Sequence, residues 1–181
     1  MQRSSSHWRT TDDGWRYDVF PLDVDAAATG EYASIAALWQ SKLNGPRLPA
    51  WRDFDLMDFR EWWGYLAVYD VVRRDPLDLW CRLWGTNLVR FHGLEVTGAN
   101  LSDPDAGMYG DSSMFDDDDV EFFDYLIDEG MIGLCRGAMT WQEREHMRVS
   151  ALRLPLADDG ARVDRILGVS QYYLDDRGGP E

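Results

Sequence analysis

The stretch MRVSALRLPLADDGARVDRILGVSQYYL, residues 147–174, decides the fold. Two runs rich in Val, Ile and Leu, residues 147–157 and 165–174, flank Asp158-Asp159-Gly160, a polar sequence typical of a turn between strands. We therefore expect these two runs to form an antiparallel hairpin.

Side chains in such strands point alternately to the two sides of the sheet. The middle run places Leu152, Leu154 and Leu156 on one side and Val149, Ala151 and Arg153 on the other. We expect the leucine side to face the core. A further run over residues 132–141, joined by a polar turn at residues 142–145, completes a predicted three-stranded meander.

Segments upstream add a second hairpin and helices. Residues 65–73 and 79–84 predict two strands, with a turn at residues 74–76 between them. Residues 31–43 carry apolar side chains at helical spacing and predict an N-terminal helix. Residues 103–129 hold eleven acidic residues and no Lys or Arg. Their four consecutive aspartates suit the N-terminus of a helix, because the helix dipole favours negative charge there.

These segments together predict an α+β domain, built from a five-stranded antiparallel sheet with helices on one face and an N-terminal helix. The domain is expected to span residues 31–174. Residues 1–30 are expected to be a flexible N-terminal tail, and residues 175–181 a C-terminal tail, because polar residues dominate both segments.

Composition narrows the function. The chain has 181 residues, of which 45 % are hydrophobic, so it can bury a core and is not of the disordered class. Its 18 basic and 33 acidic residues give a net charge of -15, which disfavours nucleic acid and anionic membrane surfaces as partners. No apolar run is long enough to span a membrane, and we expect a cytoplasmic protein.

A set of short motifs, in a consistent order, resembles a divergent bacterial branch of the PAS family of small sensory domains. The motifs are Arg82-Leu83-Trp84-Gly85-Thr86, Gly93, Glu95, Thr97-Gly98, Leu154-Pro155-Leu156, Asp159-Gly160 and Ile166-Leu167-Gly168. The resemblance implies a five-stranded antiparallel sheet whose inner face encloses a pocket together with short helices. It also implies that the outer face meets the N-terminal helix or a second protomer.

From this implied architecture we expect a mostly apolar ligand pocket, with Gln171 as a polar group that orients the ligand. Its expected lining residues are Leu83, Phe91, Phe123, Met139, Leu152, Leu154, Val169 and Gln171. Three tryptophans, Trp39, Trp80 and Trp84, are expected on an apolar interface that forms a homodimer.

The leading functional hypothesis is a sensory or regulatory domain in signal transduction. It would bind a small apolar ligand or a protein partner, and pass the change through the helix at residues 31–43 to an unidentified signalling protein. One alternative is a dimerisation or docking module whose core is completely filled. A further alternative is an enzyme with an unrecognised pocket.

The sequence favours neither enzyme chemistry nor a cofactor. Asp53, Asp55, Glu143 and His146 are candidates for acid–base work, but capping a helix and forming a hairpin turn explain them more simply. Haem would need an axial ligand, for which His92 is the one candidate considered. The four consecutive aspartates lack the spacing of a calcium loop, so no metal is expected.

Overall fold

The computed structural model describes residues 6–107, 115–139 and 146–174. Within these ranges seven antiparallel strands form one sheet in the order β1-β2-β5-β6-β7-β3-β4. The strands are β1 (Ser6–Thr10), β2 (Arg16–Phe20), β3 (Leu66–Val72), β4 (Asp78–Trp84), β5 (Ile132–Ala138), β6 (Met147–Leu156) and β7 (Arg165–Leu174).

Helices flank the sheet, and short 3-10 turns connect several of the elements. The α-helices are α1 (Ala33–Ser41), α2 (Thr86–His92) and α3 (Asp117–Glu129). The 3-10 turns are η1 (Ala26–Tyr32), η2 (Trp51–Asp53), η3 (Leu56–Phe59) and η4 (Pro104–Ala106). The α+β class predicted from the sequence is thus confirmed.

Some expected features lie outside the described residues. They are residues 1–5 of the N-terminal tail, residues 108–114 of the acidic segment, the turn at residues 142–145 with Glu143, and the C-terminal tail at residues 175–181.

The expected sheet of five strands is corrected to seven. The two additional strands, β1 and β2, lie where the sequence predicted a tail, and β2 pairs with β5 along its whole length. Tyr17, Val19 and Phe20 of β2 are buried. Five residues of alternating character between polar turns are too short a signal to identify a strand alone. The strand is defined by its pairing with a segment more than a hundred residues away.

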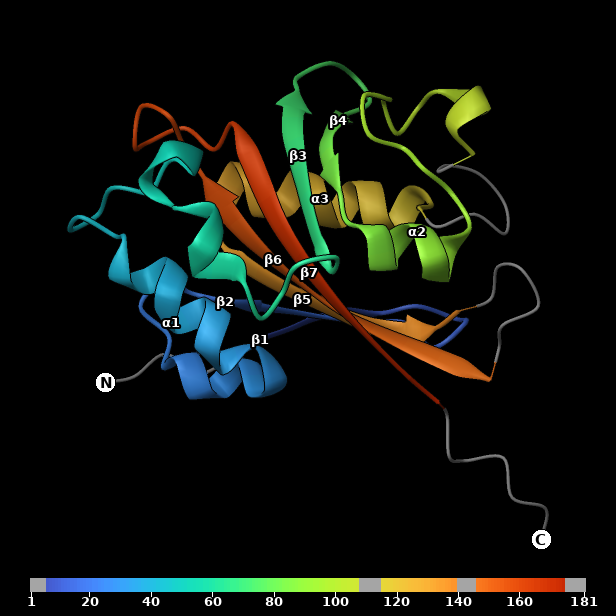
Figure 1. Cartoon of the computed structure of the whole chain (residues 1–181), viewed down its shortest axis with the longest axis horizontal. Coiled ribbons are helices and arrows are strands. Elements are labelled where there is room, and N and C mark those ends of the chain that lie inside the picture. The colour runs from blue at the N-terminus through green and yellow to red at the C-terminus, as the bar shows by residue number, and fades with distance from the viewer. Residues whose placement is uncertain (1–5, 108–114, 140–145, 175–181) are drawn as a thin grey trace, which may run out of the picture.

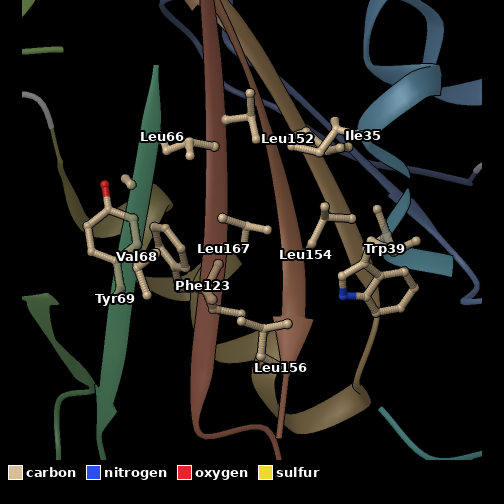
Figure 2. Packing of buried hydrophobic residues seen from close by; sticks show 14 of the residues in the cluster. Ile35, Trp39, Leu66, Val68, Tyr69, Phe123, Leu152, Leu154, Leu156 and Leu167 are labelled. Carbon is tan, nitrogen blue, oxygen red and sulfur yellow. The ribbon is translucent and has the colours of Figure 1, made fainter. Parts of the chain in front are cut away.

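The sheet is covered on both faces, by α2 and α3 on one and by the N-terminal helix α1 on the other. We call the side of β6 that carries Leu152 and Leu154 the α1 face, and the side that carries Arg153 the α3 face. Trp39 of α1 donates from Nε1 to the carbonyl oxygen of Pro155, 3.0 Å away. Figure 2 shows Leu152 and Leu154 directed toward α1. In Figure 1, α3 runs behind β3, whereas α1 lies at the lower left.

A bulge in the β3–β4 pair changes which side chains share a face. Val68 pairs with Leu83 and Tyr69 with Cys81, so the register passes over Arg82. As a result Trp84 and Cys81 lie on the α3 face, whereas Trp80 and Leu83 lie on the α1 face. Strict alternation had predicted that Trp80 and Trp84 share a side.

The α3 helix is fixed by local capping. The Asp116 side chain accepts from the Asp119 backbone N–H at 3.1 Å, and the Asp119 side chain accepts in return from the Asp116 N–H. Gly130 ends the helix in the left-handed conformation, with φ of 61°. The helix therefore has its acidic first turn at the position that the sequence predicted.

Three glycines on the α3 face leave room for large side chains to pack against the sheet. A Cβ at Gly133 would lie 2.4 Å from Leu126, and one at Gly137 would lie 2.2 Å from the Trp15 ring. A Cβ at Gly168 would lie 2.7 Å from Nη1 of Arg153. Because these glycines have no side chain, α3, Trp15 and the Arg153 guanidinium can pack directly against the backbone of the strands.

Candidate functional site

A small cavity of about 30 Å³ lies on the α3 face. Four of its lining residues are polar or charged, and the others are aromatic or small. They are Trp15, Tyr69, Trp84, His92, Phe115, Asp119, Cys135, Val149, Ala151, Arg153 and Ser170. A volume of this size has room for roughly two or three water-sized groups. The hollow is partly open, and its walls are more apolar than polar.

Arg153 is the charged group at the centre of this site. It comes from β6, a strand with neighbours on both sides, and is only 8 % exposed. Its guanidinium carbon lies 5.4 Å from the centroid of the Phe123 ring. Within the described residues no hydrogen bond or ion pair reaches the guanidinium. Burial disfavours its charge, yet nearby groups, Asp119 among them, hold the pKa of Arg153 above its usual value.

Asp119 lies at the other side of the cavity, in the first turn of α3. Its carboxylate accepts a hydrogen bond from the Tyr17 hydroxyl at 2.9 Å. Burial and the neighbouring charge of Asp116 raise the pKa of Asp119 to about 7. At neutral pH a large fraction of this carboxyl group therefore carries a proton and can donate a hydrogen bond.

The raised pKa of Asp119 predicts a pH dependence of stability. Between the ordinary aspartate pKa of 3.8 and the folded value of about 7, the folded protein holds roughly one proton that the unfolded chain lacks. The contribution of Asp119 to stability is thus full below the unfolded pKa and is lost as pH rises through about 7. Urea unfolding of Asp119→Asn should show a shallower fall in stability over that range than the unsubstituted protein.

Asp117→Asn is the matched control for this prediction, since Asp117 is an exposed acid in the same helical turn. Its pH profile should follow that of the unsubstituted protein. Identical profiles for Asp119→Asn and the unsubstituted protein would contradict the assignment of this titration to Asp119.

His92, the candidate that was considered for haem, packs at the end of α2. Its Nε2 lies 2.6 Å from the Tyr172 hydroxyl, and its ring lies 5.3 Å from Trp84, centroid to centroid. Phe91 beside it stacks on Tyr172 at 4.0 Å. These contacts hold α2 against β4 and β7 and place His92 at the wall of the cavity.

The cavity is lined by none of the residues that the sequence predicted for the ligand pocket. Phe91, Phe123 and Met139 lie near it on the α3 face. The other five, all on the α1 face, are Leu83, Leu152, Leu154, Val169 and Gln171. The physical reason is that both faces of the sheet are buried, so the leucine side meets α1 and the Arg153 side encloses the cavity.

The expected interface tryptophans have separate environments. Trp39 of α1 is fully buried against β6, and Trp84 is buried at the cavity. Neither has surface to offer a second protomer. Trp80 is partly exposed and donates from Nε1 to the carbonyl oxygen of Gly98 at 3.0 Å.

The residues that sequence reasoning missed are chiefly Arg153, Asp119, Ser170 and Tyr69. A signal for Arg153 exists in the sequence. Gly133, Cys135 and Gly137 alternate along β5, and Gly168 pairs with Arg153 across β6 and β7. Small residues at every second position indicate that something large packs on that face.

A second hollow lies at the surface beside η3. It measures about 300 Å³ and is lined in part by Leu56, Trp63, Leu66 and Leu83. Leu56 is 60 % exposed, the adjacent Met57 59 % and Trp63 47 %. We call Leu56, Met57 and Trp63 the apolar surface patch.

Two of the four candidate acid–base residues, Asp53 and Asp55, have structural roles. Asp53 accepts from the Ala50 N–H and Asp55 from the Met57 N–H, each at 2.8 Å, so both cap short turns. Burial raises the pKa of the Cys81 thiol to about 12 and that of Cys135 to about 11, which suppresses thiolate reactivity.

Among the described residues, no helix is both long enough and apolar enough to cross a membrane. Across residues 6–107, 115–139 and 146–174, no group of three or more His, Cys, Asp or Glu side chains is placed to hold a metal ion.

Comparison with known proteins adds no relative. The chain matches no family model, no curated protein and no solved structure.

Proposed function

We propose that this chain is a PAS-type sensory or regulatory domain whose cavity on the α3 face takes a small ligand. The observation that carries the proposal is a buried guanidinium at the wall of a cavity, without a hydrogen-bond or ion-pair partner among the described residues. A charged side chain that lines a cavity and has no bonded partner is available to a ligand.

The architecture gives further support. The strands β5-β6-β7-β3-β4 are consecutive within the seven-stranded antiparallel sheet. The short helix α2 and the longer α3 cover one face of this unit, with the cavity beneath them. The charged groups of Arg153 and Asp119 in its walls favour a ligand with a polar group over the purely apolar one expected from the sequence.

A route for the signal runs through β6. Arg153 faces the cavity, while its neighbours Leu152 and Leu154 face α1 (Figure 2). The ring of Trp39 joins α1 to the backbone of the same strand. A ligand that favours one of two packing states of β6 would therefore change the seating of α1. We propose that α1 then acts on an unidentified signalling protein.

A docking module is the second candidate. The small volume of the cavity and the apolar surface patch both favour it, because exposed apolar groups of this size commonly meet a partner. In that case the chain binds a protein or a second copy of itself, and the cavity holds water only.

Native mass spectrometry of the purified protein tests the proposal. We expect a mass above that of the polypeptide, which falls to the bare mass after denaturation, or a small compound that shifts the thermal unfolding temperature. A bare native mass, with no compound from a broad metabolite set shifting that temperature, would favour the docking module instead.

A further inference from the structure

We infer that the ligand of the α3-face cavity is a small carboxylate, of formate or acetate size, held by the guanidinium of Arg153. This inference rests on the proposed function, since it names the chemical class of the ligand for the same cavity.

The charge of Arg153 argues first for an anion. The side chain is more than nine-tenths buried, lines the cavity and has no hydrogen-bond or ion-pair partner within the described residues. The guanidinium presents up to five N–H donors in a plane, a geometry that a carboxylate satisfies with two parallel bonds. An anion adds a charge interaction with Arg153 that a neutral ligand lacks, and a cation would be repelled.

The position of the guanidinium is built into the fold. It lies over Gly168 on one side, where a Cβ would come within 2.7 Å of Nη1, and near the ring of Phe123 on another. The strand pairing of Arg153 with both Gly133 and Gly168 holds its backbone on β6. The donors are thus pre-organised, so little conformational entropy is lost when an anion binds.

The size of the cavity argues next for a very small anion. The space open to the centres of water-sized groups is about 30 Å³, room for a few heavy atoms, so the hollow suits an anion of formate or acetate size. Trp15, Tyr69 and Trp84 form apolar walls that suit a methyl group or a hydrogen atom on the carboxylate carbon. Larger anions such as citrate do not fit this volume.

The remaining polar walls complement a carboxylate. The carboxyl group of Asp119, whose pKa is raised, can donate a hydrogen bond when it is protonated. The cavity therefore offers a cation and one neutral donor, an arrangement that stabilises one negative charge.

The test compares sodium acetate with acetamide, which has nearly the same shape but no charge. Thermal unfolding is followed at constant ionic strength, with sodium chloride as the balancing salt. We expect acetate to raise the unfolding temperature until the effect saturates, and acetamide to leave it unchanged. Sodium formate should act as acetate does.

Variants of arginine on β6 locate the effect. Arg153→Met keeps the length of the side chain and removes a buried charge, so we expect a folded protein. Its affinity for acetate should fall by about tenfold or more. Arg153→Lys keeps the charge but not the planar guanidinium group. Its affinity for acetate should lie between those of the unsubstituted protein and Arg153→Met. Arg148→Met is the control, because Arg148 lies on the α1 face of the same strand and should leave the response intact.

The outcomes separate this inference from the proposed function. Equal effects of acetate and acetamide, or an unchanged acetate response in Arg153→Met, would overturn the carboxylate assignment. If Arg153→Met fails to fold, the acetate and acetamide comparison on the unsubstituted protein decides the matter. A neutral ligand retained in native mass spectrometry would contradict the carboxylate and leave the sensory function standing.

Discussion

Removal of residues 1–20 should abolish the folded state. Tyr17, Val19 and Phe20 are 1 %, 2 % and 3 % exposed, and each buried side chain of this kind contributes roughly 1.5–3 kcal/mol. Their sum is comparable to the roughly 5–15 kcal/mol by which a domain is stable. The truncation also leaves the edge of β5 unpaired and exposes the surface of α3 at Phe122. Circular dichroism and size-exclusion chromatography should show an unfolded or aggregated chain.

A point variant in β2 tests the same contribution by a smaller, measurable loss of stability. Tyr17→Ala should lower the stability by several kcal/mol, since it removes a buried ring that contacts Phe122 at 4.8 Å between centroids. Asp12→Ala, in the exposed turn between β1 and β2, should change it by no more than about 0.5 kcal/mol. A truncated protein with an unchanged circular dichroism spectrum and unfolding temperature would restore the interpretation of these residues as a tail.

Trp39→Ala should cost about 3–5 kcal/mol of stability, the range for truncating a large buried aromatic side chain. The ring is 0 % exposed, and its Nε1 donates to the Pro155 carbonyl at 3.0 Å. The substitution leaves a cavity between α1 and β6 and removes the donor for a buried carbonyl group. Urea unfolding measures the loss as a lower midpoint with a similar slope.

Trp63→Ala is the matched control, because Trp63 is 47 % exposed in the apolar surface patch. It should cost much less than Trp39→Ala. Similar small losses for both variants would mean that α1 does not pack on the sheet. That result would favour the sequence-based expectation that Trp39 serves an interface between protomers.

Local features of the fold were predictable from the sequence. The β6–β7 hairpin has a turn of two aspartates and a glycine between long alternating runs. The α3 helix has its capping aspartates at one end and Gly130 at the other. In each case the deciding residues are close together in the chain, so short-range rules are sufficient.

Long-range features were not predictable in the same way. β2 is a strand because β5 lies beside it, and no pattern within its five residues indicates this. The bulge at Arg82 moves Trp84 to the opposite face from Trp80. The alternation of side chains along one strand cannot predict this shift, since a bulge is a property of a pair of strands.

The candidate site was missed for a related reason. An arginine in a strand ordinarily marks a solvent-facing side, so Arg153 was placed outward and the leucines inward. In the structure β6 is central and both of its faces are buried. The identity of the pocket face depends on which helix covers which face, and that is decided by the whole chain.

The central claim is that a small carboxylate binds on the α3 face of the sheet, and tryptophan indole N–H resonances test it most directly. Trp15 and Trp84 line the cavity, whereas Trp39 lies on α1 at its contact with β6 and Trp63 lies at the surface beside η3. In a two-dimensional ¹H–¹⁵N spectrum titrated with sodium acetate, the Trp15 and Trp84 indole signals should move and saturate together, while those of Trp39 and Trp63 stay in place. Movement of the Trp63 signal alone, or of no indole signal at all, would contradict the claim.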